Sequence, residues 1–145
     1  MINTNTQWIN LDFEAPDWQC PDFPAQHLRK SFQLNAIPEY ASIRFAAPGW
    51  ADISINGKLI TEDLMIPTVT QLDQHTAFCE YDVTPLLKTG ENVIGALLGN
   101  GWFNPSTKDT WHFDKAPWRN YNRLFLELCA DGEKIVWTDD TWKAN

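Results

Sequence analysis

The dipeptide Asn56-Gly57 constrains the fold of this chain more than any other feature, because it lies between two short apolar alternations. Its apolar neighbours are Ile53 and Ile55 before it, and Leu59 and Ile60 after it. A two-residue type I′ turn needs positive φ at both central positions, and Asn-Gly adopts that conformation readily. The segment 51–61 is therefore predicted to be a β-hairpin, with Asp52 and Ser54 on the face opposite to Ile53 and Ile55.

Short apolar segments separated by turn signals continue along the rest of the chain. The predicted strands cover residues 28–35, 40–47, 77–81, 92–98, 123–130 and 134–138. Pro48-Gly49 and Asp131-Gly132 mark turns between them, and Pro85 favours one short helical turn after Thr84. About seven or eight short strands with a turn signal roughly every 10 residues are typical of an all-β protein, a β-sandwich.

The predicted strand 92–98 is apolar at nearly every position. Such a run is typical of a central strand that is covered on both faces. The next residues, 99–103, place a polar amide and two aromatic rings just beyond the end of this strand. Because recognition residues concentrate on loops at the ends of a rigid scaffold, we expect any binding site to lie there.

Composition limits the possible partners. The chain has 145 residues, enough for one domain, and a net charge of −8. An acidic body is not attracted to nucleic-acid phosphates or to anionic membrane surfaces, so neither partner is expected. No apolar run approaches the roughly 18 residues of a membrane helix, and no export signal is visible. A soluble protein is predicted, and a periplasmic, secreted or cytoplasmic location stays open.

Two regions differ from the short strands. Residues 1–27 contain Pro16, Pro21 and Pro24 among several aromatic residues, which predicts an extended N-terminal arm ahead of a sandwich at 28–145. Residues 104–120 form a long loop that includes Trp111 and Trp118. Long loops that are rich in aromatic residues are more often functional than disordered.

Residues that would support catalysis are not arranged for it in this sequence. No GxSxG motif surrounds a serine, the three histidines are isolated, and the acidic residues cannot be paired from the sequence. Cys20, Cys79 and Cys129 show no metal-ligand spacing. The chain itself is therefore not expected to be an enzyme.

Taken in order, several segments resemble the N-terminal β-sandwich domain of bacterial α-L-rhamnosidases, glycoside hydrolase family 78. They are residues 28–32, 48–58, 81–84, 86–87, 90–92 and 99–102. The resemblance covers about residues 28–145 and implies a jelly roll of the galactose-binding-like type. The family usually has Pro-Gly-Trp-Thr-Asp-Tyr in the middle connection, whereas this chain has Pro-Thr-Val-Thr-Gln-Leu at 67–72.

The resemblance also implies a parent enzyme and a ligand. Hydrolysis in such enzymes belongs to a later α/α barrel, so this chain would be an excised piece that contacts the parent's catalytic domain. Some related modules bind L-rhamnose with a calcium ion. Here Asp52, Asn100 and a carbonyl near Pro105 are the candidate ligands, since Ca²⁺ prefers carboxylate, amide and carbonyl oxygens. The alternative is that Asp52 is a solvated strand residue and Asn100 a turn former.

The candidate carbohydrate-binding residues are Asp52, Asn100, Trp102, Trp111 and Trp118. An indole face packs against sugar C–H groups while polar neighbours bind the hydroxyls. For Trp102 the alternative is a tryptophan that seals the core, and for Trp111 and Trp118 it is contact with a neighbouring domain. Three roles stay open: binding a rhamnose-containing glycan at the rim of the parent's active site, a purely structural role against the catalytic barrel, and a small standalone lectin.

Overall fold

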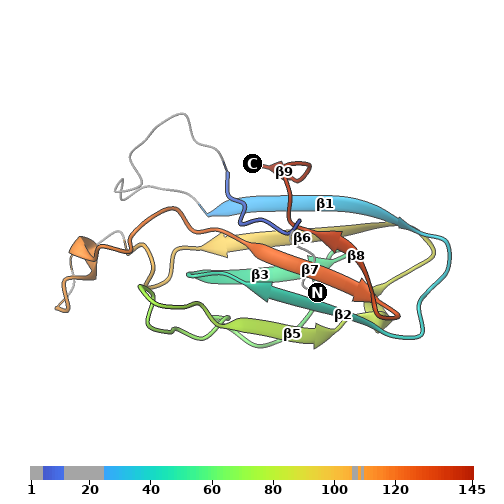
Figure 1. Ribbon diagram of the computed structural model, residues 1–145, viewed down its shortest axis with the longest axis horizontal. Helices are drawn as coiled ribbons and strands as arrows, with labels where there is room; N and C mark the ends of the chain where they lie inside the picture. Colours follow the sequence, from blue (N-terminus) through green and yellow to red (C-terminus); the bar gives the residue numbers. More distant parts are fainter. Residues whose placement is uncertain (1–4, 12–24, 106–107, 109) are drawn as a thin grey trace.

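The computed structural model describes residues 5–11, 25–105, 108 and 110–145. Two antiparallel sheets lie face to face (Figure 1). One sheet has five strands in the order β4-β3-β6-β1-β9, and the other has four in the order β5-β2-β7-β8. The predicted β-sandwich is confirmed, while the jelly-roll type stays a prediction.

The strands follow the predicted segments closely. Their bounds are β1 Gln26–Leu34, β2 Ala41–Ala46, β3 Trp50–Ile55, β4 Lys58–Leu59, β5 Phe78–Asp82, β6 Gly90–Gly99, β7 Phe125–Ala130, β8 Glu133–Trp137 and β9 Lys143–Ala144. The Asn56-Gly57 hairpin is confirmed, with φ of 52° and 81° at its two central residues. β1 begins two residues before the predicted strand, within the segment that was assigned to the N-terminal arm.

Alternate residues of both sheets meet in one apolar core. Ile43 and Phe45 point inward from the four-stranded sheet, and Ile53 and Ile94 point inward from the five-stranded sheet. Burying a side chain of this size contributes about 1.5–3 kcal/mol relative to leaving it exposed. The predicted inward faces of β2 and β7 are confirmed by this core, since Leu124, Leu126 and Leu128 are also fully buried.

β6 lies at the centre of its sheet as predicted, but it is not covered on both faces. It pairs with β1 over its whole length and with β3 from Gly99 to Ile94. Only alternate residues, among them Ile94, Ala96 and Leu98, are buried, while Val93 and Leu97 are half-buried on the outer face. The prediction of two covered faces was wrong for this chain, because the outer face of the sheet is partly open.

Two short 3₁₀ turns connect the strands, where one helical turn was predicted. The first, Thr84–Leu86, contains the predicted Pro85, and Asp82 accepts from the backbone N–H of Thr84 at 2.9 Å. The second, Phe113–Lys115, lies in the long loop between β6 and β7. This loop leaves the sandwich at the same end as the 60–77 connection, at the left of Figure 1.

The described part of the N-terminal arm lies against β7. Ile9 forms an isolated antiparallel bridge with Leu124, and the rings of Trp8 and Phe125 have centroids 5.6 Å apart. The extended arm thus joins the four-stranded sheet through a single bridge. The proline-rich part of the arm, including Cys20, lies outside the described residues.

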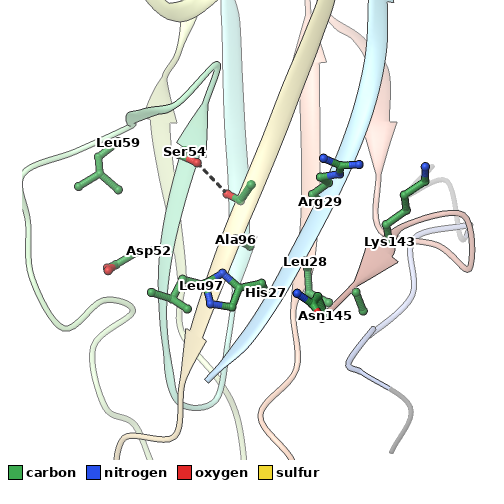
Figure 2. Close-up of a pocket in the computed structure, with 12 residues that line it drawn as sticks. His27, Leu28, Arg29, Asp52, Ser54, Leu59, Ala96, Leu97, Lys143 and Asn145 are labelled. Carbon is green, nitrogen blue, oxygen red and sulfur yellow. Dashed lines mark hydrogen bonds between the residues drawn. The ribbon is translucent and has the colours of Figure 1, made fainter. Parts of the chain in front are cut away.

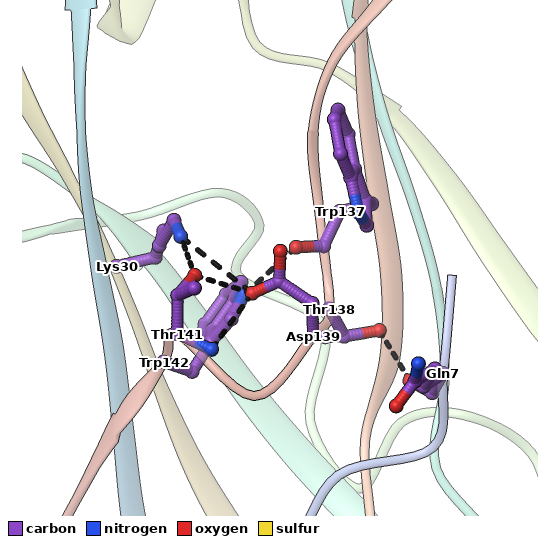
Figure 3. A network of polar contacts seen from close by, with 7 residues as sticks. All are labelled: Gln7, Lys30, Trp137, Thr138, Asp139, Thr141 and Trp142. Carbon is purple, nitrogen blue, oxygen red and sulfur yellow. Dashed lines mark hydrogen bonds and ion pairs between the residues drawn. The ribbon is translucent and has the colours of Figure 1, made fainter. Parts of the chain in front are cut away.

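The chain returns to the five-stranded sheet through a hydrogen-bonded turn after β8 (Figure 3). Asp139 accepts from the backbone N–H of Thr141 at 3.0 Å and lies 3.6 Å from Lys30 Nζ. Trp142 is buried, and its indole N–H donates to the Trp137 carbonyl at 2.8 Å. These contacts bring β9 beside β1, so the last strand joins this domain's own sheet.

Candidate functional site

The outer face of the five-stranded sheet carries a hollow of about 710 Å³, which we call the outer-sheet hollow. Its lining follows from the strand registers, which pair Ser54 with Gly95, Gly95 with Arg29, and Arg29 with Lys143. Figure 2 shows Asp52 and Leu59 on one side of the hollow and Arg29 and Lys143 on the other. A volume in this range is typical of pockets for small ligands.

Asp52 lies where three depressions of this face meet. It lines the outer-sheet hollow, a second hollow of about 340 Å³ beside Trp50 and Met65, and a third of about 50 Å³ beside Leu64. Its side chain is exposed, and none of the described residues forms an ion pair with it. A free carboxylate of this kind accepts hydrogen bonds from two neighbouring hydroxyl groups, which is the pattern that a sugar presents.

Gly95 forms the floor of the outer-sheet hollow. A Cβ at this position would lie 2.9 Å from Ser54 Oγ, which is closer than real Cβ contacts allow. The Ser54 hydroxyl donates to the Gly95 carbonyl at 3.4 Å and so lies flat along the sheet. The hollow therefore reaches the backbone of β6, as is required where a ligand approaches a strand closely.

The side chain of Asn122 fixes the backbone where the end of β6 meets Gly49 and Trp50, a place that we call the rim. Its amide group donates to the carbonyls of Trp50 at 3.1 Å and Gly99 at 2.6 Å. Its oxygen accepts from the backbone N–H groups of Gly49 at 3.0 Å and Arg123 at 2.9 Å. Because Asn122 is fully buried, the groups it bonds would be left unsatisfied without it. The rim next to Trp50 is therefore fixed by one side chain.

The backbones at positions 49 and 99 lie so close together at this rim that position 49 requires a glycine. A Cβ at Gly49 would lie 2.3 Å from the Gly99 carbonyl oxygen and 2.7 Å from Asn122 Nδ2. The sequence indicated a turn at Pro48-Gly49 but not this contact. Nothing in the sequence distinguished Asn122 either, because asparagine is common wherever a loop ends.

Four aromatic residues of the loop after β6 form one group, which we call the aromatic loop cluster. Its members are Trp102, Trp111, Phe113 and Trp118, with neighbouring ring centroids 5.7 to 6.1 Å apart. Trp111 is 68% exposed and Trp102 is 38% exposed, so Trp102 does not seal the core. The described part of the loop packs its aromatic side chains against one another and presents two indole rings to solvent.

Arg119 bonds to the carbonyl of Pro105, which was predicted as a calcium ligand. Its guanidinium donates to the Pro105 carbonyl at 2.9 Å and to Asn104 Oδ1 at 2.8 and 3.0 Å. It also donates to the carbonyl of Asp114. One predicted calcium ligand, the Pro105 carbonyl, is thus bonded to a positive group. The calcium site itself stays a prediction.

The predicted binding residues fall into two places. Asp52 lies in the outer-sheet hollow, whereas Trp102, Trp111 and Trp118 lie together in the aromatic loop cluster. Asn100 is half-buried between them, and its carbonyl accepts from the backbone N–H of Asn104 at 3.3 Å. Within the part of the chain that the structure describes, no hydrogen bond joins Asp52 to Asn100 or to the cluster, and no three His, Cys, Asp or Glu side chains are grouped for a metal ion.

Three residues of the hollow were missed by sequence analysis. His27, Arg29 and Lys143 line it beside Asp52. The pairing of β1 with β9 brings Lys143 next to Arg29. No signal in the sequence indicated this pairing.

Comparisons with known proteins agree with this architecture. The family model for the alpha-L-rhamnosidase N-terminal domain matches residues 36–145. An alpha-L-rhamnosidase of Formosa agariphila is 32% identical over 126 residues, covering 82% of this chain and 13% of that protein. The structure of an alpha-L-rhamnosidase from Dictyoglumus thermophilum has a TM-score of 0.72 at 25% identity, covering 84% of this chain and 13% of that one. The alpha-L-rhamnosidase structure from Aspergillus terreus has a TM-score of 0.75 at 25% identity, covering 92% and 15%.

Two packed sheets with a hollow on one outer face define a β-sandwich domain of the kind that forms part of larger enzymes. The chain belongs to the family of alpha-L-rhamnosidase N-terminal domains. It spans 13% of the length of the Formosa agariphila relative. Among the described residues, no helix has the length and apolar character that crossing a membrane requires.

Proposed function

We propose that this chain is a non-catalytic accessory domain of an α-L-rhamnosidase and that it binds a rhamnose-type sugar on the outer face of its five-stranded sheet. The observation that carries the proposal is Asp52, an exposed carboxylate without an ion-pair partner among the described residues, at the junction of three depressions. Membership of the rhamnosidase N-terminal family supports the assignment to a glycoside hydrolase.

The chemistry around Asp52 suits a sugar ring. The hollow beside Trp50 has a volume of about 340 Å³ and is lined mainly by apolar groups, including Leu97 and Met65. An indole and aliphatic side chains contact the C–H groups of a pyranose, while the Asp52 carboxylate accepts from its hydroxyls. Asn122 keeps Trp50 in place through the hydrogen bond to its carbonyl. The binding groups are therefore held by the sheet before any ligand arrives.

The hollow contains one carboxylate side chain among the described residues, which supports a binding role over catalysis. Hydrolysis of a glycoside needs two carboxyl groups about 5 or 6.5–9.5 Å apart. Among the described residues that line the outer-sheet hollow, Asp52 is the single acidic one. Bond cleavage in the parent is accordingly proposed to belong to another domain.

Titration of the purified chain with L-rhamnose, galactose and glucose, followed by tryptophan fluorescence, tests this proposal. We expect a saturable change with L-rhamnose, because Trp50 borders the binding hollow. Asp52→Asn should weaken binding about tenfold or more, since a charged acceptor is replaced by a neutral amide. Glu39→Gln, an exposed carboxylate remote from the hollow, is the matched control and should leave binding unchanged. Flat traces with all three sugars would contradict the proposal.

The aromatic loop cluster favours a second candidate function, docking onto the parent's catalytic domain without sugar binding. Trp111 is 68% exposed, and exposed aromatic groups often mark interfaces. Within the described part of the chain, Trp118 Nε1 and Asp114 Oδ1 are buried with no hydrogen-bond partner.

Mixing this chain with the remainder of its parent enzyme in sedimentation experiments tests the docking role. Association that Trp111→Ser weakens, together with flat sugar titrations, would establish docking in place of binding. Association that is absent, or that Trp111→Ser leaves unchanged, would exclude the cluster as the docking surface.

A further inference from the structure

Arg29 and Lys143 stand side by side in the outer-sheet hollow. Their Cα atoms are register partners in the β1–β9 pair, so both side chains leave the same face of the sheet. Both residues are exposed, and neither forms an ion pair within the described part of the chain. Like charges directly opposite each other on two strands are destabilising unless something neutralises them.

This pair is unusual in so acidic a chain. The sequence has 19 acidic and 11 basic residues, so carboxylate partners are abundant. The adjacent residue of β1, Lys30, lies 3.6 Å from Asp139. The nearest acidic residue that lines the hollow is Asp52, on β3, two strands away from Arg29 in the sheet. The sheet thus keeps its positive and negative groups on opposite sides of one hollow.

We propose that the outer-sheet hollow binds an acidic saccharide, whose anionic group lies between Arg29 and Lys143 while its hydroxyls reach Asp52 and Ser54. This inference rests on the proposed function and specifies its ligand class. Strands are about 4.8 Å apart, so the three steps from β3 to β9 span about 14 Å. That distance is longer than one sugar ring, and the hollow therefore takes an oligosaccharide with its acidic unit toward β9.

The lining of the hollow fits a saccharide better than a protein surface. Charged residues are depleted at the centres of protein interfaces, yet the lining of this hollow includes Arg29, Asp52 and Lys143. Leu59 and Leu97 are the large apolar members alongside Leu28, which belongs mainly to the core. His27 and Asn145 add further donors and acceptors for hydroxyl groups.

The two cations have complementary roles. A guanidinium matches the planar pair of oxygens of a carboxylate, or two oxygens of a sulfate, with two parallel N–H groups. An ammonium adds a point charge with three donors. Because both side chains are exposed, the expected gain from the anionic group is modest, about fivefold to tenfold in affinity.

Three galactose trisaccharides that differ only at C6 of one terminal unit test the proposal by calorimetric titration of the chain, this unit being galactose, galacturonic acid or galactose 6-sulfate. We expect the two acidic trisaccharides to bind about fivefold to tenfold more tightly than the neutral one. At about 1 M salt, where the screening length is about 3 Å, this advantage should disappear. A preference for one acidic sugar over the other identifies a carboxylate or a sulfate as the natural group.

Variants assign the effect to the two cations. Arg29→Gln and Lys143→Gln should each reduce the ratio between the affinities for the acidic and the neutral sugars, and the double variant should bring this ratio to about one. Lys88→Gln, an exposed lysine at the far end of β6, is the control and should change nothing. Thermal unfolding confirms that each variant is folded.

The outcomes separate this inference from the proposed function. If neutral sugars bind but acidic sugars bind no better, the acidic-ligand inference is wrong and the proposed function stands. If an acidic preference survives the double variant, the anion lies elsewhere and the assignment to Arg29 and Lys143 is wrong. If none of the sugars binds, both proposals fail.

Discussion

The outer faces of the two sheets differ in whether their charged residues form ion pairs. We call the outer face of the four-stranded sheet the paired face, and the outer face of the five-stranded sheet the hollow face. On the four-stranded sheet, Arg44 is bonded to Glu80 and Lys134 to Glu127, each at 2.9 Å. The Thr6 hydroxyl also donates to Glu127, so the N-terminal segment contributes to this face. On the five-stranded sheet, the described structure shows no ion pair for the charged residues that line the outer-sheet hollow.

The difference indicates which charges are structural and which are available. On the paired face, Arg44 and Glu80, and Lys134 and Glu127, already bond to each other, and a ligand would have to break these bonds. On the hollow face, Asp52, Arg29 and Lys143 are exposed and a ligand gains their interactions without that loss. The paired face and the hollow face therefore differ in whether their charged side chains are buried and paired, and not in how many charges they carry.

The largest effect should come from removing the side chain that fixes the rim of the hollow face. We expect Asn122→Leu to lower the free energy of unfolding by about 3–4 kcal/mol, because it leaves buried N–H and C=O groups of Gly49, Trp50 and Gly99 without partners. Urea denaturation measures this loss. The control is Asn120→Ala, an exposed asparagine in the same segment, which should change stability by less than about 0.5 kcal/mol. A loss below about 1 kcal/mol for Asn122→Leu would show that the rim does not depend on it.

An intermediate effect is expected from the paired face, and it depends on pH. Burial raises the pKa of Glu127, but hydrogen bonds from Thr6 and Lys134 and the charge of Lys134 more than offset this and leave the pKa below its ordinary value. A depressed pKa contributes stability that is present above the unfolded-state pKa and is lost as the pH falls through the folded-state pKa. Glu127→Gln should therefore lower stability at neutral pH by about 1–2 kcal/mol and flatten the acid limb of the stability curve.

Glu80→Gln provides the matched comparison for this experiment. The hydrogen bond from Arg44 lowers the pKa of Glu80, but the Arg44 and Glu80 side chains are 52% and 40% exposed. We expect a loss of at most about 0.5 kcal/mol at neutral pH. Thermal unfolding between acidic and neutral pH distinguishes the two variants. Equal losses would mean that burial of the Glu127 pair adds nothing.

The smallest effect on stability should come from the hollow face itself. Asp52→Asn, Arg29→Gln and Lys143→Gln should each change the free energy of unfolding by less than about 0.5 kcal/mol, because no contact of the folded chain is lost. Chemical denaturation at neutral pH provides the measurement. A loss of about 2 kcal/mol for any of them would identify that charge as structural and remove the contrast between the faces.

Local patterns in the sequence were sufficient to predict most of the sandwich. The Asn56-Gly57 turn and the alternation of Ala41, Ile43 and Phe45 depend on neighbours in sequence, and both are confirmed. The outer face of β6 was predicted wrongly, because Val93 and Leu97 are apolar whether a strand is covered or lines a hollow. The apolar pattern of one strand does not show whether another part of the protein covers its outer face.

The site was predicted less completely than the fold, since its parts meet only through long-range pairing. Asp52 and the three tryptophans were identified by residue type, but their separation into a hollow and a cluster depends on the packed loop. Arg119 was missed because its partners, Asn104 and Pro105, lie on the other side of a long loop. Arg29 and Lys143 become neighbours only when β9 is added to the sheet.

The two-residue strand β9 covers the beginning of the outer edge of β1. The backbone N–H and C=O of His27 are bonded to the C=O and N–H of Asn145, at 3.0 and 2.9 Å. A fragment that ended before Lys143 would leave one whole side of β1 with unpaired backbone groups, which is a template for strand addition by another chain. Shortened versions of this domain should therefore aggregate before they lose their core.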